Sequence, residues 1–485
     1  MSEKDARLRY RHQTLRHELG AVVGHERVSS DAEELREQAM DWSWYARYLE
    51  YRDIPVPTAD VVVRPDTAEQ VAEVLRIAYD HGVAVVPRGG GSGTQGGTLA
   101  PFGGIALDLR GLDRITEIDR TSLTVTAESG TDGAELEAAV NAEGLTLAHY
   151  PGSAHRGATL GGYLAARGSG VVSTKYGKAE DMVLSVESAL PPGRLVRTPA
   201  TPSHAAGPGL LPLLVGAEGT LGVLTSATMR LDPLPEARAF LSFGFADVDA
   251  GLRAGREIMA ARWRPAAMRL YDPAGTEYLR RSVEIGTDGV VLLVVCDGAQ
   301  RLVDLETEEI TALVRNAGGT ELGEQAARTW WDGRENPHAE SNAPKPPLLY
   351  GTADACCTFD RIGELYAAKK KVVEDEFGAR YTAHFSHWYP WGAMIYDRFY
   401  VDSPPADPDE ALALHDRIWD RLAATNLECG AVLNDHHGVG AKLGRFMRAQ
   451  YGTGFDVLCD IKRSIDPRGL MNPGKLGFPV PENLR

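Results

Sequence analysis

The chain has 485 residues, and 67 acidic against 51 basic side chains give it a formal charge of −16. An acidic chain of this kind is not expected to bind nucleic acid or an anionic membrane surface non-specifically. Five cysteines without a CxxC pair exclude a disulfide scaffold and a cysteine-rich zinc site. The first residues form no apolar signal segment, and no run of about 18 apolar residues occurs. We therefore expect a cytoplasmic protein of two or three domains without a membrane span.

Regular alternation of strands and helices begins near residue 60, after a charged, Trp/Tyr-rich segment that predicts a short helical lead-in. Strands are expected at 60–65, 83–88, 103–109 and 122–130, with helices at 67–82 and 132–144. The first helix is indicated by Val71, Val74, Leu75 and Ala78 at helical spacing, and by Gly82 as its end. Short connections between such elements are typical of a layered domain of helices and sheet.

Two glycine-rich stretches interrupt this pattern, at residues 87–97 and 151–170. Consecutive glycines let backbone N–H groups approach a pyrophosphate closely, because no Cβ atom is in the way. The first stretch contains a GxGxxG spacing at Gly91, Gly93 and Gly96, which is a weak signal alone, and no P-loop motif. The alternatives are a flexible surface turn for the first stretch and tight helix–sheet packing for the second.

A second series of elements starts near residue 240 and predicts another mixed domain. Strands are expected at 239–246, 266–272 and 290–298, helices at 248–263, 302–318 and 360–378, and two short strands within 379–389 and 393–401. The last 50 residues hold one amphipathic helix.

Several side chains in this second half can carry chemistry. The pair His436–His437 stands beside glycine, and imidazole can move protons near neutral pH. A structural role is the alternative; metal binding is not expected, because neighbours on a strand point to opposite faces and no third ligand has useful spacing. Tyr396 is either a core tyrosine or a catalytic one. Arg269 is a charge in an apolar strand, and it needs a partner such as Asp272 or a substrate carboxylate.

Aromatic residues are dense between positions 384 and 396, where two histidines, two tryptophans and two tyrosines occur. Such a stretch can line a ligand pocket or form the core of a domain interface. Trp330 and Trp331, close to Arg334, extend either interpretation.

In order along the chain, the motifs VVVRPDTAEQVAEVLRIA, VPRGGGSG, ALDL, TVTAESGTDGAELEAAV, ATLGG and VGAEGTLGVLT resemble the FAD-binding domain of the p-cresol methylhydroxylase / vanillyl-alcohol oxidase superfamily across residues 56–233. The resemblance implies an α+β fold, with a two-subdomain FAD-binding domain and a mixed α/β cap domain that contains an antiparallel sheet. It implies a lead-in at 1–55, an FAD-binding domain at 56–235, a substrate domain at 236–430 and a C-terminal segment at 431–485 that returns to the FAD domain.

The resemblance also implies bound FAD. Covalent attachment in related proteins often uses a histidine in the first glycine loop, where this chain has Gly90, Gly91 and Ser92, so non-covalent FAD is expected, although His155 in the second loop leaves covalent attachment open. The FAD contacts that it implies are Arg88, Gly89, Gly90, Gly91, Ser92, Gly93, Gly96, Pro151, Thr159, Gly161, Gly162, Ser169, Gly170, Glu218, Gly222, Val223 and Lys475.

Further motifs, AAMRLYD, GAMIYDRFYV, NDHHGVG and DPRGLMNPGKLG, resemble the alkyldihydroxyacetonephosphate synthase branch of that superfamily. Tyr396 falls on the catalytic tyrosine of that branch, Arg269 on an important arginine, and His436 and His437 on two of three essential histidines. Asp435 replaces the third. The substrate contacts implied or expected are Arg334, Glu340, His384 and Tyr389. Glu340 stands where the branch has a substrate-binding arginine, and a carboxylate there argues against a phosphorylated substrate.

We therefore expect an FAD-dependent oxidoreductase that passes hydride from a small organic substrate to flavin N5. Tyr396 or the His436–His437 pair would take the proton, Arg269 would hold a carboxylate or developing negative charge, and oxygen or another carrier would accept the electrons. The alternative is a flavin-dependent alkyl-for-acyl transferase like the synthase, and a third is a non-catalytic flavin-binding protein. A homodimer is left open.

Overall fold

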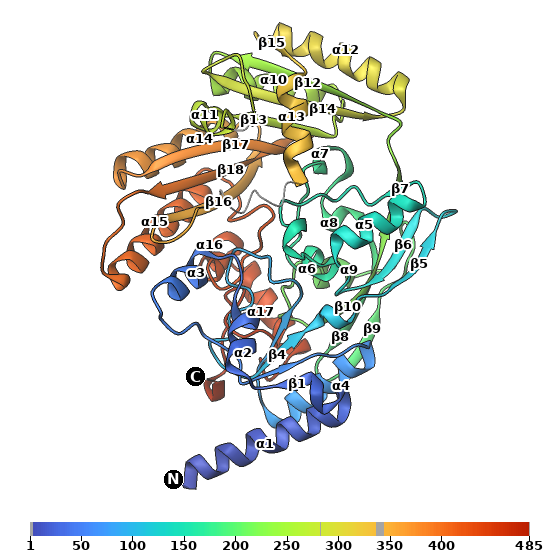
Figure 1. Ribbon diagram of the computed structural model, residues 1–485, viewed down its shortest axis with the longest axis vertical. Helices are drawn as coiled ribbons and strands as arrows, with labels where there is room; N and C mark the ends of the chain where they lie inside the picture. The colour runs from blue at the N-terminus through green and yellow to red at the C-terminus, as the bar shows by residue number, and fades with distance from the viewer. Residues whose placement is uncertain (1–2, 282, 336–343, 485) are drawn as a thin grey trace.

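The computed structural model describes residues 3–281, 283–335 and 344–484. It combines helices with four sheets, three of them antiparallel or nearly so, and this confirms the expected α+β class (Figure 1). The seven-stranded sheet of the second half lies at the top of Figure 1, above the smaller sheets of the first half. Within the described residues, no helix has the length and apolar character that crossing a membrane requires.

The first half of the chain contains short strands and helices of mixed length. Its helices are α1 (Glu3–Val23), α2 (Ala32–Ala39), α3 (Trp44–Tyr51), α4 (Ala68–His81), α5 (Gly133–Ala142), α6 (Leu160–Ala165), α7 (Ser173–Tyr176), α8 (Ala179–Met182) and α9 (Leu211–Leu214), with single turns η1 (His25–Arg27), η2 (Leu109–Gly111) and η3 (Ala154–Arg156). Its strands are β1 (Val28–Ser29), β2 (Val61–Val63), β3 (Val85–Arg88), β4 (Ile105–Asp108), β5 (Ile115–Asp119), β6 (Thr124–Glu128), β7 (Leu145–Thr146), β8 (Val183–Leu190), β9 (Arg194–Arg197), β10 (Val223–Arg230) and β11 (Asp232–Pro233).

The second half is built from longer strands. These are β12 (Ala237–Phe245), β13 (Ala267–Tyr271), β14 (Val290–Gly298), β15 (Thr320–Gly323), β16 (Leu349–Thr358), β17 (Arg380–Tyr389) and β18 (Gly392–Val401). Its helices are α10 (Val248–Ala260), α11 (Pro273–Leu279), α12 (Gln300–Asn316), α13 (Gln325–Asp332), α14 (Ile362–Lys371), α15 (Pro408–Glu428), α16 (Met447–Tyr451) and α17 (Gly454–Ile465), with turns η4 (Gly333–Glu335), η6 (Val372–Glu376), η7 (Gly444–Phe446) and η8 (Glu482–Leu484).

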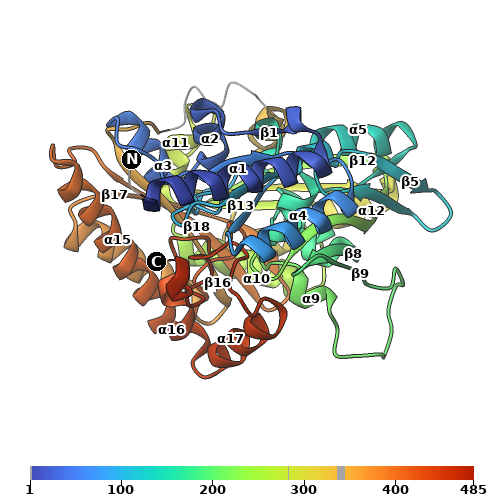
Figure 2. The same ribbon diagram turned by 90° about the horizontal axis from the view of Figure 1, so that it is seen from below.

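The N-terminal segment is more than the short helical lead-in that the sequence predicts. Helix α1 alone spans 21 residues and packs against α4, beside which it lies in Figure 2. Asp31 caps α2 and Ser43 caps α3 through their side-chain oxygens. Helix α3 then contacts β16 of the distant large sheet, and the indole of Trp44 donates a hydrogen bond of 3.0 Å to the carbonyl of Leu348.

The first sheet has the order β1-β2-β4-β3, and its β2, β4 and β3 are parallel. Helix α4 is capped by the side chain of Thr67 and ends at Gly82 in the left-handed conformation, the glycine end that its sequence predicts. The chain returns to this sheet near its C-terminus, where Val85 donates to the carbonyl of Leu470 and Asn472 donates to the carbonyl of Val85. A second sheet, β5-β6-β10-β8-β9, is antiparallel.

The large sheet has the order β15-β12-β14-β13-β17-β18-β16 and is antiparallel throughout. The two strands expected around 379–389 and 393–401 are present but are not short, because β17 and β18 each span ten residues and join in one hairpin. The sequence analysis also omitted β16, whose alternation of small and polar residues gives a weak signal. One face of β18 buries Ile395 and Phe399 in the core that α10, α14 and α15 cover. The opposite face presents Tyr396, Arg398 and Tyr400 to a cavity.

Candidate active site

A cavity of about 890 Å³ lies between the glycine loops of the first half and the free face of the large sheet. Pockets for organic ligands occupy about 300–1,000 Å³, so this cavity suits a large ligand together with a small one. The sequence-predicted FAD contacts that line it are Arg88, Gly89, Gly90, Gly91, Ser92, Gly93, Pro151, Thr159, Gly161, Gly162, Ser169, Gly170, Glu218, Gly222 and Val223. Gly96 and Lys475 are not among its lining residues.

The two glycine loops are packed against each other so closely that side chains would not fit. A Cβ atom on Gly90 would lie 1.7 Å from the carbonyl oxygen of Gly157, and one on Gly89 would lie 2.3 Å from Oγ1 of Thr159. Gly91 adopts a φ of +68°, which favours glycine. The loops therefore present bare backbone to the cavity, which is the surface that a pyrophosphate needs.

Polar groups without partners also line this part of the cavity. The Nε of Arg88 and the Oγ of Ser129 are buried and have no hydrogen-bond partner among the described residues. A buried polar group without a partner costs about 1–3 kcal/mol, which a polar ligand would recover. Together with the bare glycine backbone, these groups fit FAD.

Glu218 connects the loop before β10 to the C-terminal segment. Its carboxylate accepts hydrogen bonds from the backbone N–H groups of Val439 (2.6 Å) and Gly440 (2.7 Å). Burial raises the pKa of Glu218 to about 7. Burial also lowers the pKa of Lys475 to about 8, against the opposing charge of Glu218, and the Lys475 ammonium donates to the carbonyl of Leu99. Lys475 thus binds the backbone just after the first glycine loop and does not line the cavity.

Polar side chains form rows across the cavity face of the large sheet. Strand pairing aligns Tyr271, His384, Tyr396 and Asp354 in one row from β13 to β16. The next row holds Thr382, Arg398 and Thr352, and the row after it holds Tyr400 and Tyr350. Directly opposed residues in antiparallel strands lie about 5 Å apart, so each row is a continuous band of contacts.

Arg269 lies beside the first row and is held by a histidine. Its Nη2 donates a hydrogen bond of 2.8 Å to Nε2 of His384, and its guanidinium lies 5.1 Å from the ring centre of Trp330. The Nε of Arg269 is buried and has no hydrogen-bond partner among the described residues. Asp272, one of the two candidate partners, instead accepts from the N–H of Gly275 as the N-cap of α11.

Tyr396 stands at the centre of a cationic and aromatic group. Its ring stacks on His384 at 4.7 Å between centres, and Arg398 lies 5.2 Å from the ring centre. Burial raises the pKa of the Tyr396 phenol, but the charges of Arg398 and His436 outweigh burial and leave that pKa below its usual value. The pocket therefore stabilises the phenolate more than water does.

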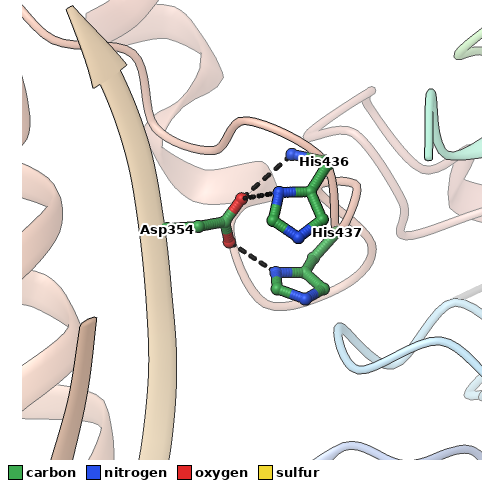
Figure 3. A group of neighbouring side chains, drawn as sticks. All are labelled: Asp354, His436 and His437. Carbon is green, nitrogen blue, oxygen red and sulfur yellow. Dashed lines mark hydrogen bonds and ion pairs between the residues drawn. The ribbon is translucent and has the colours of Figure 1, made fainter. Parts of the chain in front are cut away.

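His436 and His437 both bind one carboxylate, as Figure 3 shows. Their Nδ1 atoms lie 3.1 Å and 2.6 Å from the two oxygens of Asp354, and the backbone N–H of His436 donates to the same carboxylate at 2.9 Å. The pair occupies a loop after α15 rather than a strand, so the expectation that the rings face opposite ways is wrong. The distant residue Asp354, on the unpredicted strand β16, is the partner that sequence spacing could not identify.

A second carboxylate, Asp435, lies beside the same histidine. It accepts from His387 and His436 at 3.1 Å each and from the hydroxyl of Tyr389 at 2.8 Å. Tyr389 thus contacts Asp435 and is not among the residues that line the cavity. The Lys178 ammonium, which is also buried, donates to the carbonyl of Asp435.

The two carboxylates give the neighbouring histidines different charges. Burial opposes protonation of His436, but Asp354 and Asp435 outweigh burial and raise its pKa to about 10. Burial lowers the pKa of His387 to about 4 in spite of Asp435. Burial likewise lowers the pKa of His437, whose Asp354 partner compensates only in part. At neutral pH the group therefore contains one imidazolium, on His436.

The ligand atoms of Asp354, His436 and His437 lie within 4.8 Å of one another, and those of His387, Asp435 and His436 do so as well. Such spacing could hold a cation. The oxygens of Asp354 are already approached by two histidine rings, the amide of Asn434 and two backbone N–H groups. Because a protonated His436 offers no lone pair, the arrangement favours a hydrogen-bonded network.

Arg334 lines the cavity, and its guanidinium lies 4.0 Å from the ring centre of Trp331 and 5.3 Å from that of Tyr150. Glu340 lies outside the described residues. Trp330 lines the cavity, whereas Trp331 is buried below it. The structure thus brings together Tyr396, His436, His437, Arg269, His384 and Arg334 around one cavity. Three further residues of the site, Arg398, Asp354 and His387, were not predicted from the sequence, because no motif marks their side chains as functional.

Comparison with protein families gives two matches that cover most of the chain. Residues 59–199 match the model of an FAD-binding domain, and residues 234–476, half of the chain, match the model of the C-terminal domain of FAD-linked oxidases.

Curated relatives agree with these matches. The FAD-linked oxidoreductase YgcU of Escherichia coli strain K12 is 29% identical and covers 96% of this chain and 98% of its own length. Alkyldihydroxyacetonephosphate synthase of Caenorhabditis elegans is 26% identical over 86% of this chain and 76% of that protein. The glycolate oxidase subunit GlcD of Bacillus subtilis strain 168 is 27% identical over 88% of this chain and 90% of that protein.

Solved structures share the fold. A structure of alkyldihydroxyacetonephosphate synthase has a TM-score of 0.78 at 24% identity and covers 95% of this chain and 85% of its own. A structure of p-cresol methylhydroxylase with substrate bound has a TM-score of 0.76 at 17% identity over 96% of this chain and 97% of that one. Both share the fold, and the family matches together with the curated relatives confirm the superfamily that the sequence motifs resemble.

Proposed function

The chain belongs to the FAD-linked oxidases, and we propose that it oxidises a small organic acid, with Tyr396 as the base and Arg269 as the group that holds the acid. It is an FAD-dependent oxidoreductase, as the family matches and the relatives YgcU and GlcD indicate. The observation that carries the proposal is the position of Tyr396, stacked on His384 and flanked by Arg398 in a cavity that also contains Arg269.

The glycine loops would hold the FAD. Bare backbone at Gly89 and Gly90 and the buried guanidinium of Arg88 suit its pyrophosphate. No histidine occurs at Gly90, Gly91 or Ser92, which supports non-covalent binding. FAD supplies, when bound, an acceptor for hydride that no side chain can provide.

Tyr396 is the better candidate for the base than either histidine. A base must carry a lone pair at working pH, and His436 is protonated because its two carboxylates raise its pKa to about 10. The Nδ1–H of His437 donates to the Asp354 carboxylate at 2.6 Å, so only Nε2 of that ring is left to accept a proton. Tyr396 has a lowered pKa, so its phenolate can take the hydroxyl or amine proton of the substrate as the neighbouring C–H bond breaks.

Arg269 would orient the substrate. Its Nη2 is committed to His384, while its buried Nε has no partner among the described residues and can bind a carboxylate oxygen. Trp330 and Tyr271 flank the guanidinium and keep it away from bulk water. Charge-assisted hydrogen bonds are strong in such a site, so the acid group would fix the position of the reacting carbon.

The test is anaerobic reduction of the purified, FAD-loaded enzyme, followed at ~450 nm, the oxidised flavin band. Short hydroxy acids, amino acids and uncharged alcohols of matched size are added in turn. Bleaching by an acid but not by its uncharged analogue supports the proposal, and recovery with oxygen or with a dye identifies the class of electron acceptor. Bleaching by uncharged alcohols alone would contradict it.

The same experiment includes an acyl-dihydroxyacetone phosphate, because alkyldihydroxyacetonephosphate synthase is a relative. Release of fatty acid without transfer of electrons to any acceptor would support the transferase alternative. The replacement of the third histidine by Asp435 removes one group that the synthase branch uses, so we expect no such release.

A further inference from the structure

A second group of basic residues lines the cavity on the side of Tyr396 away from Arg269. Arg47 of α3, Arg156 of η3 and Arg398 of β18 all line the cavity around Tyr350. The Nη1 of Arg47 donates a hydrogen bond of 2.9 Å to the Tyr350 hydroxyl. All three arginines act on the phenol of Tyr350, since their charges oppose the rise that burial causes in its pKa.

Aromatic rings hold these guanidinium groups in place. Arg156 lies 3.7 Å from the ring centre of Trp42, and Arg47 lies 5.1 Å from the same ring. Among the residues that the structure describes, no Asp or Glu forms an ion pair with Arg47 or Arg398, whose polar contacts are with tyrosines and a backbone carbonyl.

Positive charges gathered in a partly buried pocket are costly unless an anion joins them. The chain as a whole has a charge of −16, so this local excess of positive charge is opposite in sign to that of the protein. A positively charged site attracts anions into the cavity, and a bound anion reduces the repulsion between the arginines. The cluster therefore has the character of a binding site for an oxyanion.

The position of the cluster relative to Tyr396 defines what could reach it. Tyr396 and Arg398 lie two residues apart on one face of β18, about 7 Å along the strand, and Tyr400, opposite Tyr350, is about 13 Å away. Arg269 lies on the other side of Tyr396. The pairing of β13, β17 and β18 places Tyr271, His384 and Tyr396 in one row across the sheet. Along the strand direction, Arg269 lies on one side of this row and Arg398 on the other. The reacting centre thus stands between two cationic regions.

We propose that Arg47, Arg156 and Arg398 form a subsite for a second oxyanion of the substrate, which is accordingly a dianion with acid groups on both sides of the carbon that is oxidised. This inference rests on the proposed function, because Arg269 is taken to bind the first acid group. The second group is a carboxylate or a phosphate, and either suits the donors of a guanidinium.

The experiment measures equilibrium binding to the FAD-loaded enzyme through the perturbation of its flavin absorbance. The probes are the straight-chain diacids from malonate to adipate, the monoacids of the same chain lengths, and the matching ω-phosphonocarboxylates. The variants are Arg47→Gln, Arg398→Gln and Arg269→Gln. Arg301→Gln, on the exposed side of α12, is the matched control for loss of one positive charge.

We expect at least one diacid or phosphonocarboxylate to bind 10-fold or more tightly than its monoacid, and the tighter of the two dianions identifies the second group. Arg47→Gln and Arg398→Gln should each remove this preference, and Arg47→Gln, which does not contact Tyr396, should leave the monoacid affinity within about 2-fold. Arg301→Gln should change neither. Two independent variants are used so that a folding defect in one, seen as loss of FAD, does not decide the result.

Equal affinity for monoacids and dianions at every chain length would overturn the subsite, as would a preference that both variants retain. Failure of the proposed function has a different signature. In that case Arg269→Gln would leave monoacid binding unchanged, or no acid would reduce the flavin, whatever the behaviour of the dianions.

Discussion

The Nη2 of Arg269 donates a hydrogen bond of 2.8 Å to Nε2 of His384, and this contact determines the protonation of the histidine. A guanidinium has only donors, so His384 must accept and be neutral at this nitrogen. Burial lowers the pKa of His384 well below its ordinary value, and the charge of Arg269 lowers it further. A neutral histidine stacked on Tyr396 therefore links the cation at Arg269 to the proposed base.

His384→Phe removes the acceptor for Arg269, and we expect it to weaken binding of a simple carboxylate such as propionate. Loss of a hydrogen bond to a charged group costs about 1.5–3 kcal/mol, or about 10- to 100-fold in the dissociation constant. His384→Gln keeps an acceptor oxygen and should recover part of the loss. Titration of the flavin absorbance measures both, and unchanged or tighter binding in His384→Phe would show that the histidine does not position Arg269.

Tyr396→Phe removes the proposed base while keeping the ring stacked on His384. General bases contribute about 10²- to 10⁴-fold to rate, so flavin reduction by the substrate should slow by a factor in that range. Retained FAD would show that the fold is intact. Reduction at the parent rate would transfer the role of base to another group.

The pH dependence of reduction tests the electrostatic part of the same argument. Reduction requires the phenolate, so the rate should rise with pH through the pKa of Tyr396, which Arg398 and His436 hold below the usual value against the effect of burial. Arg398→Gln removes one of those charges and should move the rising limb to higher pH. Stopped-flow reduction across a pH series measures the limb, and a shift to lower pH would refute the assignment.

His436 predicts a pH dependence of stability with a definite sign. Its pKa is raised to about 10 in the folded protein, because Asp354 and Asp435 outweigh the effect of burial, whereas an unfolded histidine titrates near 6.5. The stabilisation from this group is therefore complete below about pH 6.5 and is lost progressively as the pH rises toward 10. Asp354→Asn lowers the folded pKa and should flatten that slope.

Denaturant midpoints measured from pH 6 to pH 10 would record this loss of stability in the parent chain and in the variant. Equal slopes for the two proteins would mean that His436 is not held as an imidazolium by Asp354.

Gly90→Ala tests the fit of FAD to the glycine loops. The added Cβ would lie 1.7 Å from the carbonyl oxygen of Gly157, so the two loops must separate. We expect the variant to lose most of its FAD on gel filtration while its far-ultraviolet circular dichroism stays unchanged. Gly286→Ala is the control, because its Cβ would meet no atom within 4 Å. FAD retained equally by both variants would place the pyrophosphate elsewhere.

Local patterns were sufficient for part of this molecule. Helix α4 shows its apolar spacing and its glycine stop in the sequence, and its bounds agree with the prediction to within one residue. The glycine loops were identified because the absence of side chains is visible in a sequence. The strand β16 was missed because small and polar residues alternate in it without the β-branched run that marks a buried strand.

The site itself depends on pairing between distant strands, which no spacing reveals. Asp354 meets His437 across 83 positions of the chain, and Tyr350 receives a hydrogen bond from Arg47 across 303 positions. Arg398 stands in a hairpin whose alternation was visible, but only the register of β16, β17 and β18 places it beside Tyr396 and above Tyr350. Motifs therefore supplied the proposed reacting groups, and the fold adds the charged residues that lie beside them.

The reverse face of β18 supplies the last prediction. Asp397 lies between Tyr396 and Arg398 in sequence and therefore points to the opposite side of the sheet. There it binds Lys369 of α14 at 2.6 Å, and Lys369 also donates to the carbonyl of Ala353 at 2.8 Å. Both side chains are fully buried, with 0% and 1% exposure. This ion pair holds β18 on the core side of the sheet, next to the position where Tyr396, the proposed base, lies on the cavity side.

Lys369→Met leaves the Asp397 carboxylate buried without its partner, which costs about 3–5 kcal/mol in proteins, so the denaturant midpoint should fall strongly. The double variant Lys369→Met with Asp397→Leu removes both charges and should recover much of the loss, since apolar pairs replace buried ion pairs at little cost. If the pair also fixes the position of Tyr396, the double variant will regain stability but reduce its flavin more slowly than the parent chain. Recovery of both stability and reduction rate in the double variant would restrict the ion pair to a packing role. No loss of stability in Lys369→Met would mean that Asp397 becomes protonated when it stands alone. Burial already raises the pKa of Asp397 to about 6 beside Lys369, so such protonation is feasible.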